Sequence, residues 1–179
     1  IAIIAPSDPY ELYKVLNEAI NYKDSIYIRL TAGSNSKIIN EKDYDFKIGK
    51  SVEILPGKDV VIIGCGNILS NCLDAAKILK EKKIDCSVIN MHTIKPIDKE
   101  KIKMISKNYS IAFTVEEHNV IGGLASAISE VKCEESIFVK QINLGVNDQY
   151  SKSGSYEFML DYYNLSAKRI ANKVIKEIK

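Results

Sequence analysis

The 179-residue sequence has no tryptophan, two histidines and four cysteines, and only two of its 25 basic residues, Arg29 and Arg169, are arginines. Arginine supplies the planar, bidentate hydrogen bonds with which proteins grip phosphates and carboxylates, so such recognition is barely provided for. The basic residues nearly balance 23 acidic ones and leave a formal net charge of +2. Because this balance creates no global field that attracts nucleic acid or anionic lipid, we expect neither kind of partner.

Long apolar runs are also missing. The longest, at residues 1–5 and 60–63, fall far short of the ~20 residues that a membrane-spanning helix needs. The first residues lack the basic region and the long apolar stretch of a secretory signal peptide, so we expect a cytoplasmic protein. The sequence opens on Ile1 inside an expected strand, which indicates a piece of a longer protein, either a fragment or a separate subunit.

The four cysteines, Cys65, Cys72, Cys86 and Cys133, form no CxxC pair. Zinc sites and thioredoxin-type redox chemistry both rely on that spacing. We therefore interpret the cysteines as small buried hydrophobic residues in a reducing cytosol.

Short apolar runs alternate with segments of helical period along most of the chain. Strands are expected at residues 1–5, 25–30, 51–55, 59–64, 86–90, 110–115 and 136–142, and helices at 9–22, 67–83, 98–106, 122–131 and 166–179. Asp8 is expected to cap the first helix, with Pro9 as its first residue and Glu11 completing a capping box, and Asp98 to cap the third helix. This alternation predicts a three-layer α/β/α fold with a mostly parallel five-stranded sheet.

Residues 31–50 break the alternation. They combine a run of small polar residues with a charge-rich stretch and show no sustained period. A stretch of this length without secondary structure is uncommon inside a compact domain, so we predict a linker there.

The turn Gly64-Cys65-Gly66 follows a buried strand and opens a helix, as a dinucleotide-binding loop would. The third glycine of such a loop allows close packing of helix and strand, and its position holds Leu69. The pattern favours a tight strand-to-helix turn. A weak phosphate site on the backbone N–H groups of residues 64–67 stays open as an alternative.

The most unusual stretch runs Glu116-Glu117-His118, followed by two glycines, Gly122 and Gly123, that open a helix. The ends of parallel strands are where α/β folds place their sites. Proton transfer by His118 beside a carboxylate is one interpretation. The alternative is a polar turn whose glycines let the helix pack closely against a neighbour.

Two further features are interpreted as structural. His92 has no second metal ligand nearby, so we expect a hydrogen-bonded structural histidine. The basic residues of the last helix and two tyrosines before it are expected to form a solvated face rather than a nucleic-acid stripe. They are Tyr162, Tyr163, Lys168, Arg169, Lys173 and Lys176.

Several short motifs follow one another at characteristic distances. They are Val60-Val61-Ile62-Ile63-Gly64, Ala75-Ala76-Lys77-Ile78-Leu79, Val88-Ile89-Asn90, Thr93-Ile94-Lys95-Pro96-Ile97-Asp98, Thr114-Val115-Glu116-Glu117-His118 and Gly122-Gly123-Leu124 with Ala127 and Glu130. In this order they resemble the C-terminal domain of transketolase-like enzymes, and the resemblance covers essentially the whole chain. It implies a tail of a pyrimidine-binding domain at residues 1–32, a linker at 33–50 and a transketolase C-terminal-like domain at 51–179.

The resemblance implies a parent enzyme that uses thiamine diphosphate and magnesium to transfer a two-carbon ketol unit between sugars. In this family the cofactor lies between a diphosphate-binding domain and the pyrimidine-binding domain of the partner subunit. Their Gly-Asp-Gly motif and activating glutamate would lie upstream of Ile1. We therefore expect no catalytic, cofactor-binding or metal-binding residue in this chain, and no activity from the chain alone.

The resemblance also implies partners. The missing N-terminal half of the enzyme is expected in the same chain or as a separate subunit, and the assembly is expected to be a homodimer. Glu117, His118, Gly122 and Gly123 are the candidates for contact with the neighbouring domain or subunit.

One position puts the substrate in question. Many relatives carry an arginine that grips the substrate phosphate after the strand matching residues 26–30, and the equivalent here is Ala32. Arg29, three positions earlier on the expected strand, is the candidate substrate-side residue. An unphosphorylated donor, a charge from another residue or a shifted alignment would each explain the alanine.

Two alternatives stay open. Within the same superfamily, the chain would belong to the β-type subunit of a 2-oxoacid dehydrogenase or to a deoxyxylulose phosphate synthase. In a different class, it would be a stand-alone nucleotide- or anion-binding regulatory module that uses the turn at residues 64–67.

Overall fold

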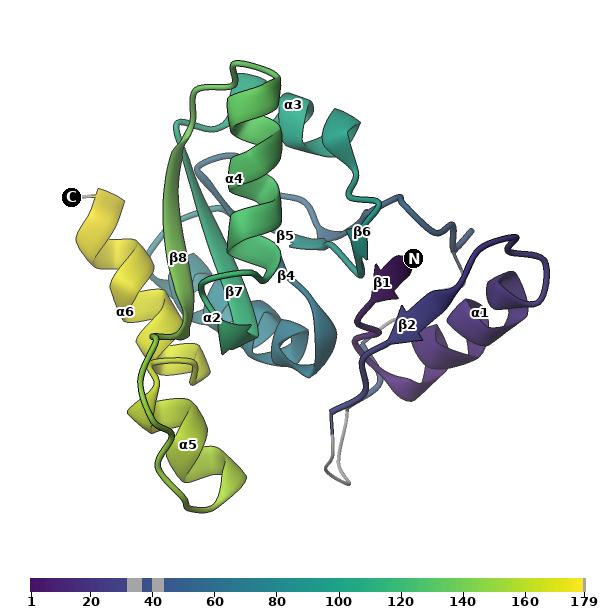
Figure 1. Cartoon of the computed structure of the whole chain (residues 1–179). Coiled ribbons are helices and arrows are strands. Elements are labelled where there is room, and N and C mark those ends of the chain that lie inside the picture. The colour runs from purple at the N-terminus through teal and green to yellow at the C-terminus, as the bar shows by residue number, and fades with distance from the viewer. Residues whose placement is uncertain (32–36, 40–43, 179) are drawn as a thin grey trace.

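The computed structural model describes residues 1–31, 37–39 and 44–178 and contains two sheets (Figure 1). The larger sheet has the strand order β3-β5-β4-β7-β8, parallel throughout except that β3 pairs antiparallel with β5. Its strands are β3 (Val52–Leu55), β4 (Val60–Gly64), β5 (Cys86–Asn90), β7 (Ile111–Asn119) and β8 (Lys140–Val146). The predicted mostly parallel, five-stranded sheet is confirmed.

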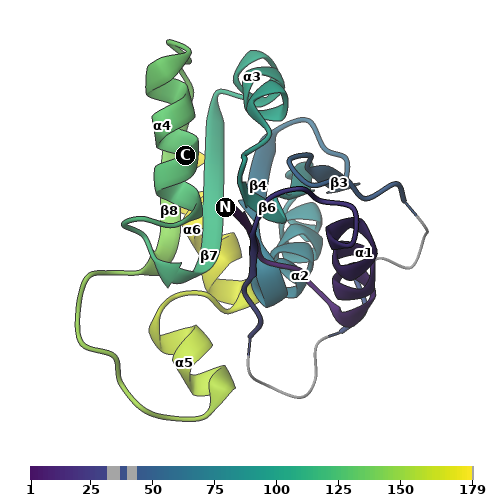
Figure 2. The ribbon, with the colours of Figure 1, turned by 45° about the vertical axis from the view of Figure 1, so that its right-hand side comes forward.

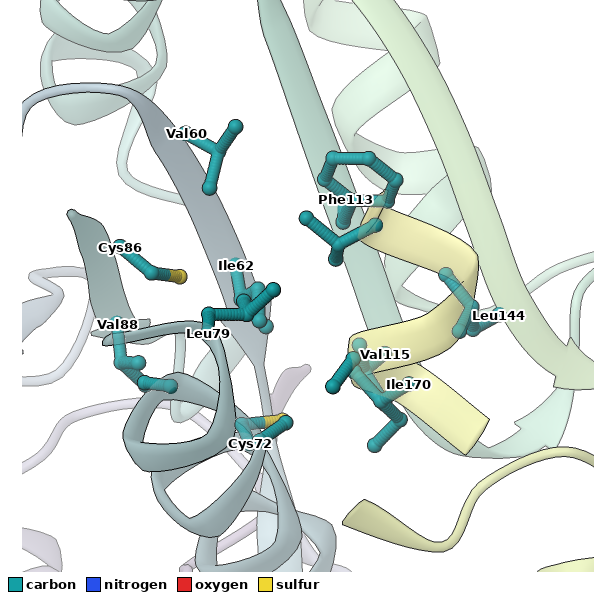
Figure 3. Packing of buried hydrophobic residues seen from close by; sticks show 14 of the residues in the cluster. Val60, Ile62, Cys72, Leu79, Cys86, Val88, Phe113, Val115, Leu144 and Ile170 are labelled. Carbon is teal, nitrogen blue, oxygen red and sulfur yellow. The ribbon is translucent and has the colours of Figure 1, made fainter. Parts of the chain in front are cut away.

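Helices cover both faces of this sheet and complete the predicted three layers (Figures 1 and 2). They are α2 (Leu69–Glu81), preceded by the short turn η1 (Gly66–Ile68), α3 (Lys99–Asn108), α4 (Leu124–Glu134) and α6 (Ala167–Ile178). Because side chains alternate along a strand, Val60 and Ile62 of β4 pack with α2 and α6 (Figure 3), whereas Val61 and Ile63 pack with α3 and α4. None of the helices in the described part of the chain is long and apolar enough to cross a membrane.

A smaller sheet lies beside the larger one. Its order is β2-β1-β6, with β1 (Ala2–Ile4) parallel to β2 (Ile26–Ile28) and antiparallel to β6 (Thr93–Lys95). Helix α1 (Pro9–Ala19) contributes Val15 to a small core with Ile4 and Phe46. The sequence does not predict β6, because three residues are too few to show a period. Its pairing means that segments from both expected domains share this sheet.

Several boundaries differ from the expectation. β7 continues to Asn119, because its last residues still pair with β8, where Asn119 lies opposite Val146. Accordingly, α4 begins at Leu124 instead of 122, and β8 lies four residues later than expected. Helix α5 (Tyr156–Tyr162) is not predicted, since its seven residues are too few for a helical period to stand out.

The segment predicted as a linker, residues 33–50, lies partly outside the described residues. Some of its described residues pack against the rest of the chain, whereas Lys37 and Ile38 are exposed. Phe46 is buried in the small core, and Tyr44 and Ile48 pack against it. The Ile39 N–H donates to the Asp8 carboxylate at 2.7 Å. These contacts tie the end of the segment to α1.

The two predicted helix caps are present, and each reaches a second segment. Asp8 caps α1 by accepting from the Glu11 N–H at 2.7 Å. The Glu11 carboxylate accepts from the Ser7 N–H, one residue before the N-cap residue that a capping box would use. Asp98 caps α3, and its second oxygen accepts from the Ser51 N–H at 2.8 Å.

A buried polar network joins the two sheets at Glu11, whose side chain is fully buried. Its carboxylate accepts hydrogen bonds from the Ser7 N–H (2.6 Å), the Asn90 amide (2.7 Å) and the Tyr44 hydroxyl (2.5 Å). We call these four residues the Glu11 junction. A buried carboxylate is costly unless donors satisfy it, so the junction fixes three segments of the chain relative to one another.

His92 is the hydrogen-bonded structural histidine that the sequence predicts. It is completely buried, with Nδ1 2.9 Å from Thr93 Oγ1 and its ring centroid 4.3 Å from that of Phe46. Burial lowers the pKa of His92, while the nearby Glu11 carboxylate opposes the shift. The neutral form is therefore favoured at this position.

The turn at residues 64–66 packs against the end of β1. Gly66 has a φ of +73°, in the left-handed region that favours glycine, and its N–H donates to the Ala5 carbonyl at 3.1 Å. An anion bound at this turn would need the Gly66 N–H as a donor, and that N–H is already engaged by the Ala5 carbonyl. The turn therefore serves as the tight strand-to-helix connection that the missing third glycine favours.

Three of the four cysteines are buried as expected. Burial raises the pKa of the Cys65 and Cys86 thiols to about 12, and Cys72 is buried on α2. Cys133 is exposed, contrary to the expectation. It lies near the end of α4, whose buried face is formed by other positions.

The Glu11 junction predicts that Tyr44→Phe destabilises the protein. The substitution removes the hydroxyl that donates to Glu11 and leaves the buried carboxylate one donor short, which costs about 1–3 kcal/mol of unfolding free energy. Urea unfolding should show this loss of unfolding free energy. The control Tyr27→Phe, at an exposed tyrosine, should change the unfolding free energy by less than about 0.5 kcal/mol. Equal stabilities of the two variants would contradict the junction.

Candidate functional site

The residues from Glu116 to Gly123, which we call the carboxylate turn, link the end of β7 to the start of α4. Glu116, Glu117 and His118 lie on β7 itself rather than beyond it, and residues 120–123 form the bend. Because strand side chains alternate, Glu116 points to α4 and Glu117 to α5. The strand end thus distributes its two carboxylates to opposite sides.

Glu116 caps α4 from the neighbouring strand. Its side chain is 2% exposed, and its two oxygens accept from the Leu124 N–H (2.7 Å) and the Ala125 N–H (2.9 Å). The N-cap residue, Gly123, has no side chain to do this, and a carboxylate suits the positive end of the helix dipole. Burial raises the pKa of Glu116, and the hydrogen bonds from the helix oppose that rise.

The two glycines are required for different reasons. A Cβ on Gly123 would lie 1.9 Å from Glu116 Oε2, so a side chain there would displace the capping carboxylate. Gly122 has free space around it but a φ of +80°, which L-residues rarely adopt. The absence of a side chain at Gly123 therefore lets the Glu116 carboxylate approach the start of α4 closely, as expected of a helix that opens on glycine.

Glu117 contacts two other parts of the chain. The Arg29 guanidinium donates to its backbone carbonyl at 2.7 Å, and the Tyr156 hydroxyl at the start of α5 donates to Oε1 of its side chain. Burial raises the pKa of Glu117, while the Tyr156 hydrogen bond and the Arg29 charge oppose the rise. This residue connects β7 with the segment after β2 and with α5.

His118 is placed beside these carboxylates but is engaged by the backbone. Its Nδ1 lies 2.8 Å from the Asn119 carbonyl and 4.0 Å from Glu116 Oε2. The geometry requires Nδ1–H to donate to that carbonyl. Because both Glu116 oxygens already accept from α4, the arrangement favours a braced polar turn over a proton-transfer pair.

The structure brings together two candidates that the sequence separates by 88 positions, Arg29 and Glu117. Arg29 follows β2, which ends at Ile28, instead of lying on the strand. Its guanidinium braces the carboxylate turn, and Ala32 lies outside the described residues. Sequence reasoning missed the capping role of Glu116 and the contact of Tyr156. The only signal for the former is a helix start with glycine where a capping side chain is usual.

A groove of about 330 Å³ opens beside the carboxylate turn, between α4 and β6. Gly122 and Gly123 line one side of it, and Ile94 and Ile97 line the other. Ile121, at the tip of the turn, is 66% exposed. The turn therefore presents an apolar side chain next to a surface groove.

The capping geometry predicts unequal costs for the two glycines. Gly122→Ala should cost about 1–2 kcal/mol of unfolding free energy, because only its backbone conformation is strained. Gly123→Ala should cost more, about 3 kcal/mol, because it also breaks a buried hydrogen-bonded cap. Denaturant unfolding of both variants tests this order, and a Gly123→Ala cost no larger than that of Gly122→Ala would contradict it.

Comparisons with known proteins identify relatives of this architecture. The family described as transketolase, C-terminal domain, matches residues 49–170. A protein of Methanocaldococcus jannaschii that carries the name of a transketolase C-terminal section is 36% identical over 180 residues, covering 100% of this chain and 56% of that protein. One subunit of an apulose-4-phosphate transketolase of Actinobacillus succinogenes is 32% identical over 173 residues, covering 96% of this chain and 55% of that subunit. A 1-deoxy-D-xylulose-5-phosphate synthase of Caldanaerobacter subterraneus is 30% identical over 179 residues, covering 100% of this chain and 29% of the synthase.

The solved structure of a split-gene transketolase, an inactive beta4 tetramer, matches with a TM-score of 0.92 and 32% identity, covering 99% of this chain and 57% of that one. The chain thus spans little more than half the length of two of the related proteins and of this structure, and less of the synthase. With the family match over most of its length and a shared fold, the chain belongs to the transketolase C-terminal domain family.

Proposed function

We propose that the chain is the C-terminal section of a transketolase-type enzyme that uses thiamine diphosphate to transfer a two-carbon ketol unit between sugars. The observation that carries this proposal is that the chain aligns over its full length with 56% of a relative named as a C-terminal section. The catalytic motifs would lie in polypeptide N-terminal to it, in the same chain or in a separate subunit. A relative named as one subunit of a transketolase and a split-gene structure support a divided enzyme.

The residues of this chain do not by themselves fit a thiamine diphosphate site. The sequence contains no Gly-Asp-Gly motif. In the described part of the chain, no group of three or more His, Cys, Asp or Glu side chains is placed to hold the magnesium ion. We therefore derive no step of the reaction from these side chains and expect the isolated chain to be inactive. Its proposed part is to complete the fold and the assembly.

We infer that residues 1–32 are the tail of a pyrimidine-binding domain, joined by a linker at 33–50 to the C-terminal domain at 51–179. The β2 edge of the smaller sheet supports the assignment of residues 1–32 to a larger domain, whereas at its other edge β6, from residues 51–179, pairs with β1. Among the described residues β2 pairs only with β1, and the apolar side chains of Ile1, Tyr27 and Leu30 are exposed around it. An exposed apolar sheet edge is normally covered, and the upstream polypeptide would cover this one.

We also infer a homodimer in which the carboxylate turn contacts the second copy. The exposed Ile121 and the neighbouring groove support this surface. The bend is fixed beforehand by the Glu116 cap on one side and by Arg29 on the other. Such preorganisation lowers the entropy that a surface loses on association.

A deoxyxylulose phosphate synthase is the second candidate. It is favoured by one observation, the 30% identity with the synthase of Caldanaerobacter subterraneus over the whole of this chain. The longer synthase would place the same section at the end of a single polypeptide.

Reconstitution tests the proposed function. The chain would be mixed with the separately produced upstream half of the same enzyme, thiamine diphosphate and magnesium ions. We expect each half alone to be inactive and the mixture to transfer a two-carbon unit from a ketose to an aldose. Formation of 1-deoxy-D-xylulose 5-phosphate instead would select the second candidate. A mixture of folded halves without either activity would contradict the proposal.

The association surface predicts that Ile121→Asp shifts self-association toward the monomer. A charge at the centre of an apolar contact has to be desolvated without a partner, so we expect at least a roughly tenfold loss of dimer affinity. Sedimentation equilibrium measures this directly. The control Phe138→Asp changes another exposed apolar residue, between α4 and β8, and should leave the affinity unchanged. Equal effects of both substitutions would remove the turn from the interface.

A further inference from the structure

A pocket of about 540 Å³ opens between the carboxyl end of β8 and the last helix, α6. Three cationic side chains of α6, Arg169, Lys173 and Lys176, line one wall. Asn147 lines the pocket just beyond the end of β8, and Asn164 and Asn172 line it from the segment before α6 and from α6 itself. The pocket is within the volume range of small-molecule sites.

The sequence spacing explains why these cations gather on one side. Positions 169, 173 and 176 recur at helical intervals, so they share one face of α6. The other face carries Ile170 and Val174, which are buried in the core that α6 forms with α2. Packing of the apolar face therefore turns the basic face toward β8. The face is exposed to solvent, as the sequence indicates, and Arg169, Lys173 and Lys176 on it also line the pocket.

The charge of the pocket has one sign. No carboxylate is among its lining residues. Two of the cations form ion pairs with carboxylates that do not line the pocket. Arg169 pairs with Asp161 at 3.0 Å, and Lys173 pairs with Glu177 at 2.8 Å. The Lys176 ammonium group makes no hydrogen bond or ion pair with any described residue. Arg169 holds Asp161 in a bidentate pair. The single-contact pair of Lys173 is worth little, so an entering anion with several charges can recruit Lys173 together with Lys176.

The lining also offers polar groups that carry no charge. Side-chain amides can donate to phosphate oxygens and exchange hydrogen bonds with hydroxyl groups of an attached organic part. A guanidinium and two ammonium groups around a concave, amide-lined wall are the partners that phosphate groups use. We propose that this pocket binds a small molecule through a phosphate or diphosphate group. The site is independent of the carboxylate turn, which lies outside its lining.

Calorimetric titration of the chain with sodium pyrophosphate tests the proposal. We expect saturable one-to-one binding with a Kd of about 0.1–1 mM, beyond the heat of sodium chloride at the same ionic strength. The double variant Lys173→Gln/Lys176→Gln should weaken binding at least roughly tenfold. The matched control is Lys77→Gln/Lys80→Gln on α2, which has the same spacing and also includes a lysine paired with a carboxylate, Asp74.

The two variants give distinguishable outcomes. Loss of binding in the pocket variant and retention in the control support the site, provided that thermal unfolding shows both variants folded. Absence of saturable binding, or equal weakening in both variants, would overturn it. A parallel titration with ADP distinguishes the sources of the phosphate. Tighter binding than pyrophosphate indicates a phosphorylated metabolite, and equal binding indicates recognition of the diphosphate alone.

Discussion

The fully buried Glu11 carboxylate is the constraint on which the arrangement of the two sheets depends. A charge in this position is strongly destabilising unless its oxygens accept hydrogen bonds. Its donors come from Ser7 before α1, Asn90 at the end of β5 and Tyr44 before β3. Satisfying one side chain therefore positions three segments that are far apart in the chain.

Buried carboxylates that accept backbone hydrogen bonds also occur at three helix starts. Asp8, Asp98 and Glu116 are almost completely buried, and each accepts from the first turn of a helix. Asp8 also holds Ile39, and Asp98 also holds Ser51. Helix capping thus doubles as the connection between segments. At the carboxylate turn this connection brings β7, α4 and, through Arg29, the segment after β2 to one place, where the fold offers a braced surface to a partner.

The local part of this architecture follows from the sequence. The caps at Asp8 and Asp98, the layer order and the parallel sheet are predicted, because capping residues and apolar periods act over a few neighbouring positions. Both candidate places, Arg29 and the turn from Glu117 to Gly123, can also be chosen from the sequence. Their contact cannot, because it joins residues 88 positions apart through a backbone carbonyl, which carries no sequence signal.

Other features lie beyond sequence reasoning for related reasons. Strand β6 exists because β1 offers it a hydrogen-bonding edge, and α5 is too short to show a helical period. The cap that Glu116 provides comes from a different element than the helix it caps. The basic face of α6 is visible in the sequence, but the pocket wall opposite it is contributed by β8.

Native-state hydrogen exchange tests the central claim most directly, namely that the buried carboxylates make the two sheets one cooperative unit. The Ser7 amide, which donates to Glu11, reports on the junction, and the Ile62 amide on central strand β4 reports on the larger sheet. The account predicts that both amides exchange through the same global unfolding, with equal free energies of opening. Exchange of Ser7 through a separate opening of much lower free energy, while Ile62 stays protected, would contradict it.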